Sequence, residues 1–318
     1  MAFTKGAAAA IAVVAGVAAI AVVFFLLART PVYAVVHPFQ PRFEAVPYGP
    51  PVRQRYDVFS PESPTGPLVF YLHGGGWMAG NRSQIHEQLD VRRLLDAGLT
   101  VVTVGYRYLR ECERDTPDFP LASVHDDIAT AYQNVIADAD RIGFDPGKVI
   151  ACGASAGGYS ALWLALRDSP VKPAAAVVCK AQVTIDPRLV LGWHPNWTYG
   201  SNAAGFRSIF LSPAQEWSRF NGSLDGLESR FDEHCPTRLL SIDDPPVIIF
   251  YPQVNMPERG SRPDDPVHSA AHGLIIKERA ESIGFDQCHV KMLGASGTAN
   301  ARGQFTDHVL SVAEKLSG

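Results

Sequence analysis

The stretch that decides the fold is Lys148–Leu166, KVIACGASAGGYSALWLAL. It opens with a short apolar run, Val149–Cys152, whose length and bulk are typical of a buried strand. It closes with Ala156–Leu166, which is rich in Ala and Leu and therefore favours a helix. The G-x-S-x-G sequence Gly153–Gly157 lies between them, so the pattern predicts a sharp strand–turn–helix with Ser155 presented at the turn. The other interpretation is a tight turn whose serine caps the helix.

A second glycine-rich loop, His73-Gly74-Gly75-Gly76-Trp77, directly follows the apolar run Leu68–Leu72. A loop of this kind at a strand end can direct free N–H groups at an oxyanion, where one donor typically contributes about 2.7–4 kcal/mol. A phosphate-binding loop is the alternative. That alternative is disfavoured because no lysine follows in P-loop register and the GxGxxG spacing is absent.

The sequence resembles the α/β-hydrolase superfamily, in its hormone-sensitive-lipase-like and carboxylesterase branch. The resemblance rests on two motifs, HGGGW and, about eighty residues later, GASAGG. The resemblance implies an α/β fold with a mostly parallel, doubly wound sheet and an insert, or cap. It also implies that Ser155 is the nucleophile and that the amides of Gly74, Gly75 and Ala156 form the oxyanion hole. Trp77 is expected to pack this loop or to wall the substrate pocket.

A serine nucleophile needs a base and an acid that orients the base, and in this superfamily the acid and then the histidine follow the serine. The resemblance implies an Asp-Pro-Val-like sequence past a late strand, and Asp265 begins the match. The loop Pro252–Asp264 is longer than the family pattern. Asp264 and Glu258 therefore remain rivals for the role of the acid.

The family's histidine usually stands a few residues beyond the last strand, but the matching stretch Gly294–Thr298 contains none. His308 is the candidate downstream and is the expected base, with His268, His272 and His289 as the alternatives. His268 and His272 also have the i, i+4 spacing of zinc ligands. No HExxH sequence accompanies them, so neither a metal nor another cofactor is expected.

The predicted function is a serine hydrolase that cleaves carboxylic esters of small molecules through an acyl-enzyme. The alternative, which the missing turn histidine motivates, is a hydrolase-like domain that has lost its base and binds a ligand.

The length of the chain, with 47% hydrophobic residues and 19% charged residues, fits one catalytic domain plus an appendage. A formal net charge of −4 and the lack of a basic patch argue against nucleic acid as a partner.

Five cysteines do not make a disulfide framework. Cys152 and Cys179 lie in apolar runs and are expected to be free thiols in neighbouring buried strands. One disulfide among Cys112, Cys235 and Cys288 stays open, because sequence alone cannot pair them.

The N-terminal residues Ala7–Ala28 form an uncharged apolar run, and about 20 such residues suffice for a membrane-spanning helix. We expect a retained signal-anchor in residues 1–29, with the hydrolase domain on the extracytoplasmic side. The alternative is a secreted protein, cleaved near Val32-Tyr33-Ala34. A proline-rich linker is expected over 30–51 and the hydrolase domain over 52–318.

Apolar runs alternate with helical patterns along the rest of the chain, which predicts a parallel sheet covered on both faces. The ligand is then expected beyond the carboxyl ends of the strands. The expected strands are Val52–Phe59, Leu68–Leu72, Thr100–Tyr106, Val149–Cys152, Ala174–Ala181, Val247–Tyr251 and His289–Leu293. The expected helices include Ser83–Ala97, Leu121–Ile142, Ala156–Leu166 and Thr306–Leu316. An aromatic-rich insert at about 182–243 interrupts the alternation.

Overall fold

The computed structural model describes residues 35–318 except 117, 195–227, 254, 262–264, 266 and 294–299. The chain divides into two compact units, Met1–Val36 and His37–Gly318, and the second contains the features that follow. Within these described ranges, no helix has the length and apolar character needed to cross a membrane. The predicted span at 7–28 lies outside the described residues.

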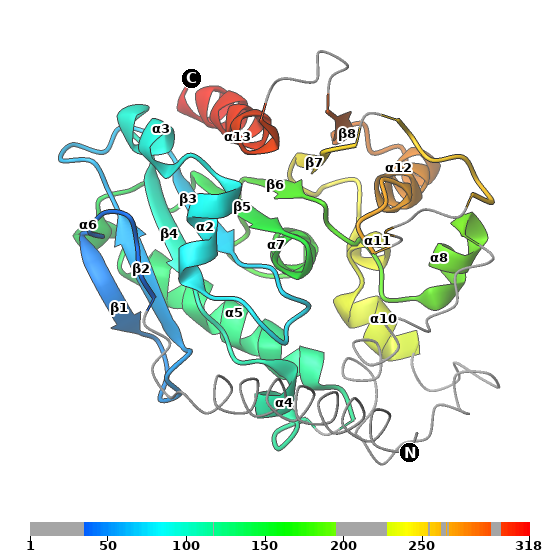
Figure 1. Cartoon of the computed structure of the whole chain (residues 1–318), viewed down its shortest axis with the longest axis horizontal. Helices are drawn as coiled ribbons and strands as arrows, with labels where there is room; N and C mark the ends of the chain where they lie inside the picture. Colours follow the sequence, from blue (N-terminus) through cyan, green and yellow to red (C-terminus); the bar gives the residue numbers. More distant parts are fainter. Residues whose placement is uncertain are drawn as a thin grey trace, which may run out of the picture. The chain divides into compact units, whose positions relative to one another are not determined.

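One eight-stranded sheet forms the centre of the second unit (Figure 1). Its strands, in chain order, are β1 Phe43–Pro47, β2 Arg55–Phe59, β3 Leu68–Leu72, β4 Thr100–Val104, β5 Val149–Ala154, β6 Ala175–Cys179, β7 Val247–Tyr251 and β8 Cys288–Met292. Their spatial order is β1-β2-β4-β3-β5-β6-β7-β8. β1 and β2, and β2 and β4, pair antiparallel, while every pair from β4 to β8 is parallel. The predicted α/β-hydrolase architecture with a mostly parallel sheet is therefore confirmed.

Helices cover both faces of the sheet, and each face has its own apolar core. One core contains buried side chains of α5 Pro120–Ala137, α7 Ala156–Leu166 and α12 Ala271–Ile283. The other contains side chains of α2 Ile85–Gln88, α3 Val91–Asp96 and α13 Ala301–Ser317. Strands buried on both faces explain why the sequence reads as continuous apolar runs rather than as alternating ones.

Shorter helices complete the described chain, and several belong to the region around the predicted insert. They are η1 Arg82–Gln84, α4 Leu109–Cys112, α6 Ala139–Ile142, α8 Pro187–Trp193, α10 Glu228–His234 and α11 Pro236–Leu239. The central part of the insert lies outside the described residues, together with most of its aromatic side chains.

Three predicted elements differ from the structure. The single helix expected at Leu121–Ile142 is divided at Asp138 into α5 and α6. The expected linker over 30–51 contains strand β1, which pairs with β2 and extends the sheet at its antiparallel edge. The single helix expected at Ser83–Ala97 is interrupted, because the backbone of Leu89 is extended. A new helix, α3, starts after Asp90, whose side chain caps it by accepting a hydrogen bond from the amide of Arg93. A carboxylate at an N-cap competes with continuation of the preceding helix.

All five cysteines are buried free thiols. Cys152 and Cys179 lie on the adjacent strands β5 and β6, as expected. The disulfide that the sequence allowed among Cys112, Cys235 and Cys288 does not form, because all three are free thiols.

Candidate active site

The G-x-S-x-G sequence forms the predicted sharp turn between β5 and α7. Ser155 has φ 54° and ψ −125°, a strained conformation for a residue with a side chain. A Cβ added to Gly157 would lie 2.1 Å from the carbonyl oxygen of Leu72 at the end of β3. The turn therefore packs directly on the neighbouring strand, and only glycine permits this approach.

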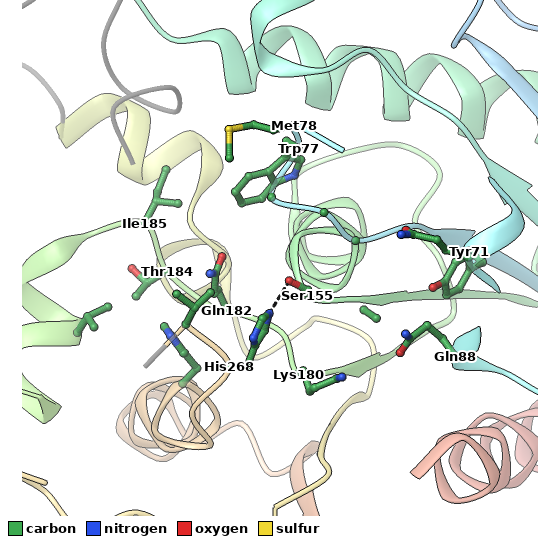
Figure 2. A pocket seen from close by; sticks show the side chains of 18 residues that line it. Tyr71, Trp77, Met78, Gln88, Ser155, Lys180, Gln182, Thr184, Ile185 and His268 are labelled. Atoms are coloured by element: carbon green, nitrogen blue, oxygen red, sulfur yellow. Dashed lines mark hydrogen bonds between the residues drawn. The ribbon is translucent and has the colours of Figure 1, made fainter. Parts of the chain in front are cut away.

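The Ser155 hydroxyl is engaged by a histidine that sequence reasoning ranked as an alternative. Ser155 Oγ lies 2.8 Å from Nε2 of His268 (Figure 2). Nδ1 of His268 lies 2.7 Å from Oδ2 of Asp265, three residues earlier in the chain. With the Nδ1–H donating to the carboxylate, Nε2 is left to accept the hydroxyl proton. The arrangement has the connectivity of an activated serine nucleophile.

The Asp265 carboxylate is held in its ionised form. Burial raises the pKa of Asp265, but the hydrogen bonds from the ring and the backbone of His268 outweigh it, so the pKa lies below its usual value. The side chain of Asp265 is 58% exposed and that of His268 is 32% exposed. The pair thus lies at the mouth of the site, where solvent weakens its electrostatic contribution.

The structure places His308 away from Ser155, which corrects the expectation for the base. His308 follows the start of α13 by seven residues and packs on Phe250 of β7, with ring centroids 5.2 Å apart. The helix begins earlier than expected, at Ala301, so the preceding loop cannot deliver His308 to the serine. The signal that could have identified His268 is the D-x-x-H spacing that begins at Asp265.

Of the other candidates for the acid or the base, those that the structure describes make no contact with the Ser155 hydroxyl. Glu258 is exposed, His289 is an exposed residue of β8, and Asp264 lies outside the described residues. His272 is buried in α12 and lines the same pocket as Ser155. In the described part of the chain, no three His, Cys, Asp or Glu side chains are grouped as metal ligands would be.

Gln253 and His194 hold the turn that carries His268. Gln253, just beyond β7, donates from Nε2 to the carbonyl of His268 at 2.9 Å and accepts from the amide of Ala270 at 3.0 Å. His194 contacts the hydroxyl of Ser269 at 3.2 Å through Nε2. Sequence analysis singled out neither residue, because their role depends on contacts between distant segments.

The HGGGW loop lies against the nucleophile turn. A Cβ on Gly74 would meet the carbonyl oxygen of Ala154 at 3.0 Å and Cβ of Ser155 at 3.4 Å. The amides of Gly74 and Gly75 donate no hydrogen bond to any described residue. Ala156 begins α7, and the first amides of a helix lack partners within it. Gly74 and Gly75 line the pocket that contains Ser155, and the assignment of their amides and that of Ala156 to an oxyanion hole stays a prediction.

His73 and Trp77 fix the ends of this loop. Nδ1–H of His73 donates to the carbonyl of Gly74 at 2.8 Å, and its ring stacks on Tyr106 with centroids 4.2 Å apart. Burial lowers the pKa of His73 to about 4, so the ring is neutral at pH 7. Trp77 donates from Nε1 to the hydroxyl of Ser160 in α7 at 2.9 Å and also lines the pocket. Both roles expected for Trp77 therefore fit its position.

A cavity of about 510 Å³ opens over Ser155 and His268. Figure 2 shows it between the HGGGW loop, the carboxyl ends of the strands and the segment after β6. Its other lining residues are mostly apolar or neutral and polar, namely Tyr71, Gly74, Gly75, Gly76, Trp77, Met78, Gln84, Gln88, Ala154, Lys180, Gln182, Thr184, Ile185, Val190, Val267 and His272. A cleft of this size and composition is suited to a small organic ligand.

Comparisons with known proteins agree with this geometry. The family model BD-FAE matches residues 56–194. An ethyl acetate hydrolase of Pseudomonas putida is 34% identical over 122 residues, which cover 38% of this chain and 35% of that enzyme. Carboxylesterase NlhH of Mycobacterium tuberculosis is 34% identical over 92 residues, covering 29% of this chain and 26% of that enzyme. The chain thus spans between about a quarter and about a third of the length of these relatives.

Solved structures extend the likeness over the whole fold. An inhibited esterase B of Lactobacillus rhamnosis has a TM-score of 0.63 at 17% identity, covering 98% of this chain and 96% of that one. A truncated carbohydrate esterase from gut microbiota has a TM-score of 0.59 at 14% identity, covering 88% and 95%. At these identities the likeness concerns the fold.

Proposed function

We propose that this chain, which has the α/β-hydrolase fold and resembles esterases in part of its sequence, hydrolyses carboxylic esters through a covalent acyl-enzyme. The observation that carries the proposal is the line of contacts from Ser155 Oγ to His268 Nε2 and from His268 Nδ1 to Asp265 Oδ2. A serine hydroxyl becomes an effective nucleophile only when a neighbouring base accepts its proton.

In the first half of the reaction, Ser155 Oγ attacks the ester carbonyl while His268 Nε2 takes the hydroxyl proton. The carbonyl oxygen becomes an oxyanion, and the amides of Gly74, Gly75 and Ala156 stabilise it. Asp265 keeps His268 in the required tautomer and stabilises the imidazolium. The intermediate collapses when His268 returns the proton to the departing alcohol oxygen, which leaves Ser155 acylated.

In the second half, a water molecule takes the place of the alcohol. His268 removes its proton, the water oxygen attacks the acyl carbonyl, and the same amides stabilise the second oxyanion. Proton return to Ser155 Oγ releases the carboxylic acid. The chemistry uses side chains and backbone amides alone.

The experiment compares p-nitrophenyl acetate turnover by the wild type with that of Ser155→Ala, His268→Ala and His308→Ala. Loss of general base catalysis by His268→Ala is expected to lower kcat by about 10²- to 10⁴-fold. Ser155→Ala is expected to abolish both turnover and labelling by a fluorophosphonate. His308→Ala, which alters a helix packed on Phe250, is the matched histidine control and should retain most of the rate.

Two results would contradict the proposal. Full activity of His268→Ala together with an inactive His308→Ala would restore the base assignment made from the sequence. A folded wild type that neither turns over esters nor reacts with a fluorophosphonate would favour the ligand-binding alternative.

We propose further that residues 1–29 anchor the enzyme in a membrane, with the hydrolase domain on the extracytoplasmic side. The support is the apolar run Ala7–Ala28. Carbonate washing of membranes that contain the full chain, followed by N-terminal sequencing, distinguishes a retained anchor from a cleaved and released form.

We also propose that the insert at about 182–243 forms a cap over the ester pocket, because its described edge contributes Gln182, Thr184 and Ile185 to the lining.

A further inference from the structure

The ester pocket has one end that is polar and positively charged. Among the described residues that line the pocket, Lys180 alone carries a permanent charge, and none is an Asp or a Glu. Its ammonium makes no ion pair or hydrogen bond with the residues that the structure describes. A positive charge without a partner in a cleft attracts anionic ligands.

The backbone directs Lys180 toward the pocket at a cost in strain. Lys180 has φ 50°, in the left-handed region that disfavours a residue with a side chain. Its amide donates to the carbonyl of Phe250 at 2.8 Å, directly beyond the end of β6, which fixes the bend. Strained residues of this kind are retained where the surrounding structure imposes them, and they cluster at ligand sites.

Tyr71 supplies a second, independent observation at the same end of the pocket. Its side chain is fully buried, yet its hydroxyl has no hydrogen-bond partner among the described residues. Buried hydroxyls are normally paired, so an unpaired one that lines a ligand pocket indicates a donor reserved for the ligand. Figure 2 shows the Tyr71 hydroxyl, the Gln88 amide and the Lys180 ammonium toward one side of the pocket, away from Thr184 and Ile185.

We propose that Tyr71, Gln88 and Lys180 form a carboxylate-binding subsite, so that the favoured substrates are esters that carry a free carboxylate. Lys180 supplies the charge, and the Tyr71 hydroxyl and the Gln88 amide donate hydrogen bonds to the two oxygens. The subsite lies to one side of Ser155, so the substrate's ester and carboxylate groups are separated by a short spacer. This inference rests on the proposed esterase function and names its substrate class.

The test uses two pairs of esters in which a terminal methyl group is replaced by a carboxylate. Monoethyl glutarate against ethyl valerate places the charge on the acyl side. The acetate ester of 5-hydroxypentanoate against pentyl acetate places it on the alcohol side. A pH-stat records the acid released, and the readout is the ratio of kcat/KM for the charged and the neutral member of each pair.

We expect the wild type to favour the charged ester in one of the two pairs. Lys180→Met should lower that ratio by about tenfold to a hundredfold, which is the range for a hydrogen bond to a charged group. Tyr71→Phe, which removes only the hydroxyl, should lower it by several-fold. Lys277→Met is the matched control, because Lys277 is an exposed residue of α12 paired with Glu281.

Calorimetry on the Ser155→Ala protein provides a readout independent of turnover. Monoethyl glutarate or the acetate ester of 5-hydroxypentanoate should bind more tightly than its neutral partner, and a further Lys180→Met substitution should remove the difference. A wild type that prefers the neutral ester in both pairs, or a ratio that survives Lys180→Met, would overturn the subsite. Such a result with normal hydrolysis of the neutral esters would leave the proposed function intact.

Discussion

Acid should loosen the wall of the ester pocket through a buried pair of histidines. Nδ1 of His125 in α5 lies 2.9 Å from Nδ1 of His234 at the end of α10, and the His125 ring stacks on Trp163 with centroids 4.0 Å apart. The carbonyl of His234 accepts the hydroxyl of Tyr159 at 2.8 Å. The next residue, Cys235, accepts the amide of Ile185, which lines the pocket.

The sign of the effect follows from the pKa of His234. Burial, with a smaller contribution from Arg230, lowers the pKa of His234 to about 4, and burial also lowers the pKa of His125 well below its usual value. Arg167 is the other cation that disfavours a charged His125, while Glu233 lies 3.9 Å from Nε2 of His234. Between pH 6.5 and 4 the unfolded chain binds a proton that the folded chain does not, so stability falls as the pH falls through this range.

The magnitude can be worked from these values. With a pKa of about 4 in the folded state and about 6.5 in the unfolded state, His234 alone lowers the free energy of unfolding by about 2 kcal/mol between pH 7.5 and pH 5. Urea unfolding at the two pH values measures the loss. His234→Asn removes the titration but keeps a polar atom near the position of Nδ1, so its loss should be smaller than that of the wild type by about 2 kcal/mol.

His289→Asn is the control, because His289 is an exposed residue of β8 and its substitution should leave the pH dependence unchanged. His73 and His86, whose pKa values burial also lowers to about 4, contribute equally to both proteins and cancel in the comparison. The reasoning would be refuted if His234→Asn lost as much stability as the wild type on acidification.

Three further predictions follow from the site and its supports. Asp265→Asn should lower kcat by about 10- to 10²-fold. The loss should be modest for a carboxylate that orients a base, because the Asp265 side chain is exposed, and a kcat–pH profile would show its effect on the base. Gln253→Ala removes two hydrogen bonds to the turn of the catalytic histidine, so kcat should fall several-fold with little change in KM, whereas Gln253→Glu should recover part of the rate through the Ala270 amide. Gly157→Ala places a Cβ 2.1 Å from a β3 carbonyl oxygen and should prevent folding. Gly303→Ala is the control, because Gly303 lies near the start of α13 and an added Cβ would meet nothing within 4 Å. In a urea titration this second change should raise the free energy of unfolding by up to about 1 kcal/mol.

The sequence was sufficient to predict the sheet and the nucleophile because both depend on local patterns. Apolar runs predicted the seven strands from β2 to β8, and small residues around Ser155 predicted the turn. β1 was missed because Phe43–Pro47 is a short edge strand with a mixed pattern of exposure, held in the sheet by its pairing with β2. Such pairing leaves no local periodicity for sequence reasoning to detect.

The base was mispredicted because its position depends on the path of a loop. The family pattern directed attention beyond β8, where the chain continues to α13 and His308 packs on β7. The expected acid, Asp265, does contact a histidine, but that histidine is its own near neighbour. Gln253 and His194, which hold the turn, come from segments that only the folded chain brings together.

Asp265 and His268 lie in one turn, so the distance between His268 and Ser155 can change independently of the distance within the acid–base pair. Because Asp265 and His268 are three residues apart, a shift of the turn moves both and preserves their mutual hydrogen bond. Only the separation between His268 and Ser155 then changes. In the proposed mechanism, activation of Ser155 therefore depends on this one separation, and a displacement of the turn would break the contact with Ser155 while the Asp265–His268 pair stays intact.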